Sequence, residues 1–289
     1  MKKSISYWAF AGGLEGTKGI RAAMAEAKQY GFEAIELCVG DTGALSLDST
    51  KAECAAMRAN AADMGIEISS VASGIFWGYN FGSSDAKLRA KCAEATKKML
   101  QIANWLGTDA LLTIPAAVDV FFNPASEVVP YDVAYERAVA GIKKVLPVAE
   151  KCKVVLAIEN VWHKFLISPL EMCSFIDSFQ SPYVGSYFDV GNVLRTGYPE
   201  QWISILGKRI TRVHLKDYRV AAADANGFVD LLEGDVNWPE VMKALKTIGY
   251  DGYLTAEMIP TYRFYPEVRL INTSAAMDAI MGRSNVKTL

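Results

Sequence analysis

The feature that most constrains the fold of this chain is a regular alternation of two hydrophobic periods along its 289 residues. Short apolar runs, several of them unbroken stretches of valine, isoleucine and leucine, are typical of strands buried on both faces of a sheet. Nearly every run is followed by a segment with helical spacing. The runs are residues 5–10, 32–39, 66–72, 110–115, 154–159, 184–188, 210–215 and 252–257. This order predicts an α/β protein with a parallel sheet.

Several of the intervening segments carry helix boundary signals. Thr50 and Glu53 have the spacing of a capping box, and Gly65 ends the helix that they open. A second helix is predicted from Tyr131 to residue 152, and Pro147 is expected to kink or end it. These signals place the helices between the predicted strands, as a parallel sheet requires.

The number of strands favours a closed barrel. Eight strand and helix units without a linker or low-complexity segment predict a single (β/α)8 TIM barrel domain over residues 1–289. An open doubly wound sheet is the competing architecture. Its dinucleotide-binding form needs the spacing G-x-G-x-x-G, and residues 11–16 lack that spacing.

Charge, hydropathy and cysteine content exclude several functional classes. The net charge is −2, which gives no general attraction for nucleic acid. No apolar stretch approaches the length of a membrane span. The five cysteines are scattered and contain no C-x-x-C pair, which favours a reduced, cytoplasmic protein.

Polar residues that end the predicted strands are the best candidates for a functional site, because barrels carry function at that end. Four consecutive strands end at Glu159, Asp189, His214 and Glu257. Each has a structural alternative when taken alone, such as a helix cap for Glu159 or a turn for Asp189. Three carboxylates buried together repel one another unless a cation offsets their charge. Oxygen donors with one imidazole suit a single divalent ion such as Mn, Mg, Co or Zn.

Four motifs around these residues resemble the xylose-isomerase-like TIM-barrel superfamily, and within it the sugar phosphate isomerase/epimerase branch. They are residues 158–160, 188–192, 213–217 and 255–258. The resemblance implies an enzyme whose metal ion is held by Glu159, Asp189, His214 and Glu257. It also implies that Glu159 and Glu257 are the catalytic acid and base on opposite sides of the substrate carbon. Proton transfer next to a carbonyl would proceed through a metal-stabilised enediolate.

The resemblance favours 3-epimerisation of a ketose or ketose phosphate, with a small-molecule sugar as the partner. Tagatose-type 3-epimerases carry a histidine at the position of Asn192 and a glutamate at the position of Phe165, which disfavours a free ketohexose. Residues 214–217 are more similar to L-xylulose-5-phosphate 3-epimerase and inosose dehydratase. One alternative is therefore an inosose-type dehydratase (a lyase) on the same metal site. The alternative of another class is a non-catalytic sugar-binding protein.

Other residues near the strand ends are weaker candidates for substrate binding. The alternative for His163 is that it lies exposed on a loop without a role in binding. The alternative for Lys216 is a structural ion pair with Asp217 or Glu36. Tryptophans can either wall a sugar pocket or fill a barrel core. The full set is His163, Lys216, Asn192, Glu36, Trp8 and Trp77. For the assembly of the chain, a homodimer or a homotetramer is the expectation.

Overall fold

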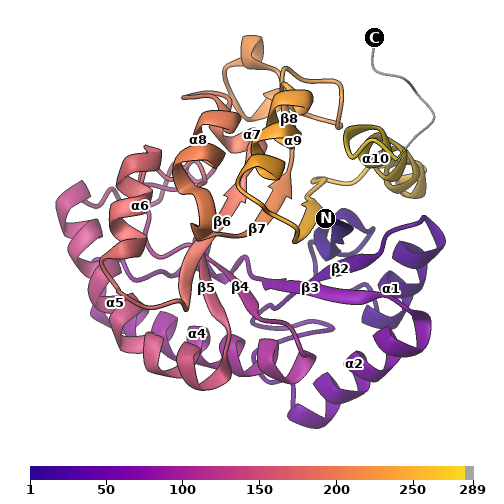
Figure 1. Cartoon of the computed structure of the whole chain (residues 1–289). Coiled ribbons are helices and arrows are strands. Elements are labelled where there is room, and N and C mark those ends of the chain that lie inside the picture. Colours follow the sequence, from indigo (N-terminus) through magenta and orange to yellow (C-terminus); the bar gives the residue numbers. More distant parts are fainter. Residues whose placement is uncertain (284–289) are drawn as a thin grey trace.

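A computed structural model describes residues 1–283 and shows eight parallel strands closed into a barrel, with helices around it (Figure 1). The strands follow one another around the barrel in the order β1-β10-β7-β6-β5-β4-β3-β2. They are β1 (Lys2–Ser6), β2 (Ala34–Cys38), β3 (Glu67–Ala72), β4 (Ala110–Thr113), β5 (Val155–Glu159), β6 (Val184–Asp189), β7 (Ile210–Leu215) and β10 (Tyr253–Ala256). The predicted (β/α)8 barrel is confirmed.

The helices lie on the outside of the barrel in Figure 1 and pack their apolar faces against the strands. They are α1 (Ile20–Gln29), α2 (Lys51–Met64), α3 (Ile75–Gly78), α4 (Ala86–Leu106), α5 (Tyr131–Cys152), α6 (Pro169–Asp177), α7 (Val190–Val193), α8 (Pro199–Leu206), α9 (Trp238–Thr247) and α10 (Pro266–Ile280). Among residues 1–283, no helix combines the length and the apolar character needed to cross a membrane.

Local sequence signals account for the helix boundaries. The hydroxyl of Thr50 accepts a hydrogen bond from Glu53 N, and the carboxylate of Glu53 accepts one from Thr50 N, so the predicted capping box opens α2. Gly107 ends α4 with φ of 82°, a left-handed conformation that favours glycine.

One predicted boundary is wrong. The first strand ends at Ser6, and the apolar residues Tyr7–Ala9 form a 3-10 turn. The last strand partners are Ala256 of β10 for Ile5 and Glu36 of β2 for Ser6.

The helix predicted from Tyr131 to residue 152 is confirmed as α5, and of the two effects expected of Pro147, a kink or an end, the helix does not end there. Proline removes one backbone donor, and buried apolar residues on both sides of it, Val145 and Ala149, hold the helix against the barrel.

A two-stranded antiparallel ribbon, formed by β8 (Asp217–Tyr218) and β9 (Phe228–Val229), follows β7 directly and lies outside the barrel. Its buried carboxylate, Asp217, accepts hydrogen bonds from Leu232 N at 2.9 Å, Val236 N at 3.2 Å and the indole of Trp238 at 3.0 Å. Asp217 therefore holds the segment between β9 and α9. The prediction of one domain over 1–289 includes residues 284–289, which lie outside the described range.

Candidate active site

Four predicted side chains meet at the carboxyl end of the barrel. One ligand atom from each of Glu159, Asp189, His214 and Glu257 lies within 4.8 Å of the other three, and all four residues are buried. The strand register explains this, since Asp189 on β6 pairs directly with His214 on β7. Glu159 ends β5, and Glu257 follows β10.

His214 Nδ1 faces the three carboxylates. It lies 3.4 Å from Glu159 Oε1, 3.9 Å from Asp189 Oδ2 and 3.9 Å from Glu257 Oε2. Within residues 1–283, His214 Nδ1 has no hydrogen bond of good geometry, and Asp189 Oδ2 has only an ion pair with Lys216 Nζ at 3.0 Å. A buried polar atom without a hydrogen bond is costly, and these two atoms border the same small space. A divalent cation fits this donor set, which consists of carboxylate oxygens and one imidazole nitrogen.

The electrostatics of the cluster point the same way. Burial raises the pKa of Glu159 to about 7, and the charge of Glu257 adds to the shift against the opposing effects of His214 and Lys216. Burial also raises the pKa of Asp189, although Lys216 and His214 oppose it. The positive charges of Lys216 and His214 therefore do not fully offset the free-energy cost of burying the ionised carboxylates of Glu159 and Asp189.

Glu36 lies beneath the cluster and holds His214 from its other side. Glu36 Oε1 is 3.0 Å from His214 Nε2, while Glu36 Oε2 accepts from Ser70 Oγ at 2.8 Å and from Tyr187 OH at 2.5 Å. Burial would raise the pKa of Glu36, but the positive charge of His214 and these hydrogen bonds lower it instead. This charge belongs to the metal-free protein, in which the pKa of His214 is raised well above its usual value by the neighbouring carboxylates against the effect of burial. A metal ion would replace the proton on Nδ1, and the carboxylate bonded to Nε2–H would keep the Nδ1 lone pair directed at that ion.

We expect Glu36→Gln to weaken binding of a divalent ion by about 10–100-fold, because the Glu36 carboxylate that orients the imidazole of His214 is lost. Equilibrium dialysis against Mn²⁺ measures this. Glu33→Gln serves as the control, because this half-buried glutamate directly precedes β2 and pairs with Arg283 instead of His214. It should bind Mn²⁺ like the wild type. Unchanged affinity in Glu36→Gln would mean that Glu36 does not support a metal-binding His214.

Lys216 lies on the opposite side of the carboxylates from Glu36. Its Nζ is 3.0 Å from Asp189 Oδ2 and forms an ion pair with Glu257 Oε2. These partners differ from Asp217 and Glu36, the two expected for a structural role. Gly191 allows this approach, because a Cβ there would lie 2.8 Å from the carbonyl oxygen of Lys216.

A pair of asparagines fixes the ends of β5 and β6, and sequence reasoning missed one of them. Asn160 accepts from Asp189 N at 2.9 Å and donates to Asp189 O at 2.8 Å. Asn192 donates to Asn160 O at 2.9 Å, and its backbone N donates to Asp189 Oδ1 at 2.8 Å. Asn160 directly follows Glu159, so its position after a metal-ligand candidate was the available signal.

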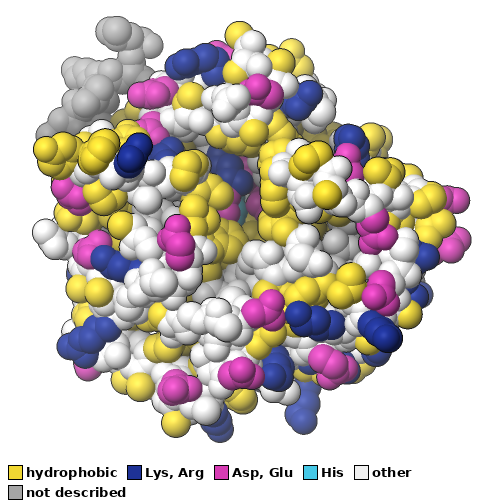
Figure 2. Space-filling model, turned by 180° about the vertical axis from the view of Figure 1, so that it is seen from behind, with side chains coloured by type: hydrophobic (Ala, Val, Ile, Leu, Met, Phe, Trp, Pro, Cys, Tyr) yellow, Lys and Arg dark blue, Asp and Glu magenta, His cyan; other side chains and the backbone are white. Residues whose placement is uncertain are grey.

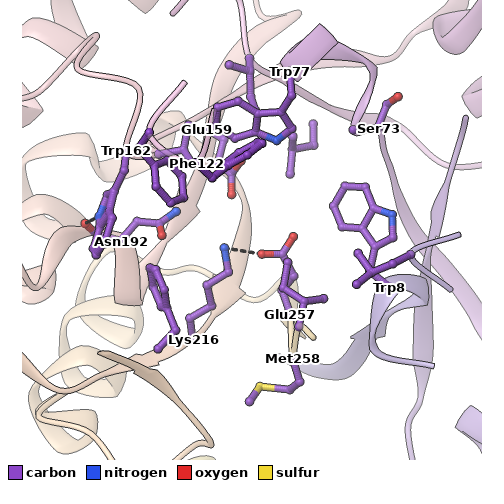
Figure 3. A pocket seen from close by; sticks show the side chains of 18 of the residues that line it. Trp8, Ser73, Trp77, Phe122, Glu159, Trp162, Asn192, Lys216, Glu257 and Met258 are labelled. Atoms are coloured by element: carbon purple, nitrogen blue, oxygen red, sulfur yellow. Dashed lines mark hydrogen bonds and ion pairs between the residues drawn. The ribbon is translucent and has the colours of Figure 1, made fainter. Parts of the chain in front are cut away.

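The cluster lies at the bottom of a cavity of about 370 Å³. Figure 2 shows this hollow near the centre of one face, with basic and acidic side chains at its bottom and hydrophobic side chains around it. Five of the predicted substrate-binding or catalytic side chains line it together with Asn192: Trp8, Trp77, Glu159, Lys216 and Glu257. In Figure 3, Lys216 and Glu257 face each other below the rings of Trp77 and Phe122.

Two predicted substrate-binding residues lie elsewhere. Glu36 is below the cavity, in contact with His214, and is not among the described residues that line it. His163 is fully buried and packs against Phe165, whose backbone N lies 3.4 Å from His163 Nδ1. It is neither an exposed loop residue nor part of the cavity lining. Its Nε2 has no hydrogen-bond partner among the described residues.

Burial lowers the pKa of His163 from 6.5 to about 3, so the folded protein keeps this imidazole neutral at pH values where the unfolded chain is protonated. The unfolded state then binds more protons, and stability falls as the pH drops below 6.5. Because of His163, we expect the free energy of unfolding to be about 2 kcal/mol lower at pH 5 than at pH 7. Urea denaturation of metal-free wild type and His163→Asn at both pH values measures the difference. Equal pH dependence in the two proteins would contradict a neutral buried imidazole.

Comparisons with known proteins bear on the family and the fold of the chain. A family model described as Xylose isomerase-like TIM barrel matches residues 24–277. The L-ribulose-5-phosphate 3-epimerase UlaE of Salmonella typhimurium is 26% identical over 235 residues, which cover 80% of this chain and 79% of that protein.

Solved structures share the fold at lower identity. The D-psicose 3-epimerase of Clostridium cellulolyticum H10, solved with D-tagatose, has a TM-score of 0.77 at 17% identity and covers 97% of this chain and 98% of its own. The IOLI protein with a bound zinc atom has a TM-score of 0.78 at 14% identity, with 98% and 99% covered. The resemblance predicted from the strand-end motifs is confirmed. The chain belongs to the xylose isomerase-like TIM barrel family.

Proposed function

We propose that this protein is a metal-dependent sugar or sugar-phosphate epimerase that inverts the carbon next to the carbonyl of a ketose. One observation carries the proposal. Two buried glutamates, Glu159 and Glu257, stand on strands separated in the barrel by β6 and β7, and both line a cavity whose base holds Asp189 and His214.

Inversion of a carbon centre needs one group to remove a proton and another to return one on the opposite face. Glu159 and Glu257 approach the cluster from different strands, so their carboxylates can contact the two faces of one substrate carbon.

The metal ligands of this proposal are Glu159, Asp189, His214 and Glu257. A divalent ion there would polarise the substrate carbonyl and offset the negative charge that develops as the neighbouring proton leaves. Lys216 Nζ borders the same space and can donate a hydrogen bond to a substrate oxygen. Asn192 and the aromatic side chains of the cavity position the sugar and exclude water.

The curated relative is named for L-ribulose 5-phosphate, so a pentulose is the first substrate to test. We expect metal-loaded protein to convert L-ribulose or its 5-phosphate to the C3 epimer, detected by chromatography of the products. Loss of water from an inosose instead would assign the lyase alternative. Binding of ketoses without conversion of any would support a non-catalytic sugar-binding protein and contradict the epimerase.

The proposal includes a cytoplasmic location, which all five cysteines support by being free thiols in the described structure.

A further inference from the structure

We propose that the sugar handled by this site carries an apolar, aryl-sized substituent in place of a phosphate. This inference rests on the proposed epimerase function and names its substrate class. The inference is based on the residues of the cavity walls, which have no part in the proton transfer proposed at the base of the cavity.

The outer wall is a row of aromatic rings, most of which pack edge to face. Trp77 and Phe122 have ring centroids 5.1 Å apart, Phe122 and Phe121 are 5.0 Å apart, and Phe121 and Trp162 are 5.7 Å apart. Phe228 continues the row, with its centroid 4.9 Å from that of Trp162. All five rings line the cavity above the metal-ligand candidates, and Figure 3 shows Trp77 and Phe122 over Lys216 and Glu257.

This wall is open to solvent. Phe122 is 56% exposed and Phe121 is 41% exposed, although both belong to a cavity lining. Apolar surface that remains in contact with water at a cleft is typical of a ligand site. A sugar ring offers C–H faces to aromatic side chains, but its hydroxyl groups gain little from so extended an apolar wall. An aryl or similar apolar group would cover it.

Among residues 1–283, the cavity lining contains no unpaired cation for a phosphate. Of the described residues that line it, two have cationic side chains, Lys216 and Arg269. Lys216 is paired with Asp189 and Glu257. Arg269 is paired with Asp230 at 2.6 Å and also donates to the carbonyl of Pro260. A phosphate dianion would therefore be desolvated without a charge partner of its own.

Arg195 is a basic group outside this lining. Its guanidinium lies 5.2 Å from the ring centroid of Trp162, and it lines an adjoining hollow rather than the cavity. Within the cavity, a substituent on the sugar would therefore meet the aromatic wall.

The test compares three ketoses that differ at one position: L-ribulose, L-ribulose 5-phosphate and 5-O-benzyl-L-ribulose. Both 5-substituted sugars have O5 blocked and are matched as open-chain ketones. We expect Mn²⁺-loaded protein to show a kcat/KM for the benzyl ether about 10- to 100-fold above that for the matched 5-phosphate, as expected from burying one phenyl group.

Binding is measured separately by titration calorimetry in EDTA, where turnover is absent. We expect the benzyl ether to bind at least about ten-fold more tightly than the phosphate. Phe122→Ala should reduce the benzyl-to-ribulose ratio of kcat/KM by about 3- to 10-fold. Phe264→Ala removes an aromatic ring that is 72% exposed and outside the cavity lining, and should leave the ratio unchanged.

The outcomes separate the two proposals. A phosphate preferred over the benzyl ether in turnover and in binding would overturn the apolar-substituent inference and leave the epimerase standing. Tighter binding of the benzyl ether without epimerisation of any of the three sugars would support this inference and contradict the proposed function. An unchanged ratio in Phe122→Ala would show that the aromatic wall does not hold the substituent.

Discussion

Replacing Glu257 or Glu159 with glutamine is expected to lower kcat for ketose epimerisation by about 10²–10⁴-fold, the range for loss of a general acid or base. Glutamine keeps an oxygen at the metal position but cannot accept or donate the proton. Each variant should retain bound Mn²⁺, measured by elemental analysis after dialysis. Steady-state kinetics with the ketose converted most rapidly by the wild type gives the comparison.

Glu94→Gln is the matched control, because this glutamate on α4 is exposed and pairs with Lys97. It should retain wild-type kinetics. The two site variants should also differ from each other in deuterium exchange into the starting ketose. In one of them, the glutamate that remains can still remove and return a proton on one face of the substrate carbon without forming product. If both variants bind metal and turn over within a few-fold of wild type, the glutamates are ligands only, and Lys216 becomes the leading acid–base candidate.

Removing the metal is the second change with a large expected effect. Asp189→Ala should abolish stoichiometric Mn²⁺ binding and activity together, since Asp189 supplies a ligand and no proton transfer. EDTA should inactivate the wild type, and Mn²⁺ or Co²⁺ should restore it. Metal at about a hundred-fold excess over Kd should stabilise the wild type by roughly 3 kcal/mol, measured by thermal unfolding with and without ion.

The fold of the variant needs its own check, because Asp189 Oδ1 accepts a hydrogen bond from Asn192 N. Asp189→Asn keeps that acceptor and lowers only the charge, so it should fold and still bind Mn²⁺ more weakly than wild type. Asp63→Ala, on the exposed side of α2, is the control for a surface carboxylate. Full activity in the metal-stripped wild type would contradict the metal centre.

The barrel and the four-residue cluster could be predicted because both depend on local periodicity. Buried parallel strands read as apolar runs, and their carboxyl ends meet at one rim, so Glu159, Asp189, His214 and Glu257 could be placed together from strand boundaries alone. The first boundary was wrong because residues 7–9 are apolar for packing in a 3-10 turn rather than in a strand.

The contacts across the barrel interior could not be predicted in the same way. Glu36 is 178 residues from His214 in sequence, and their pairing depends on which interior side chains meet at one level of the barrel. Tyr187 lies two residues before Asp189, so strand periodicity places it on the same side of β6, but periodicity does not identify Glu36 as its partner.

The loop residues were the hardest to place. His163 follows a strand end by four positions, and nothing in that spacing distinguishes a cavity position from a buried one behind Phe165. Phe121 and Phe122 belong to the segment between β4 and α5, where no regular period applies, and their contacts with Trp77 and Trp162 exist only in the folded chain.

The most direct test of the metal-assisted proton transfer is NMR of a ketose panel in deuterated water with Mg²⁺-loaded, metal-stripped and reconstituted protein. We expect deuterium at the carbon next to the carbonyl of at least one ketose, together with the C3 epimer of that ketose. The deuterium incorporation and the epimer should both disappear with EDTA and return when Mg²⁺ is added back. Exchange at the same rate in metal-stripped protein, or no exchange with any ketose in protein that holds stoichiometric metal, would contradict metal-assisted proton transfer.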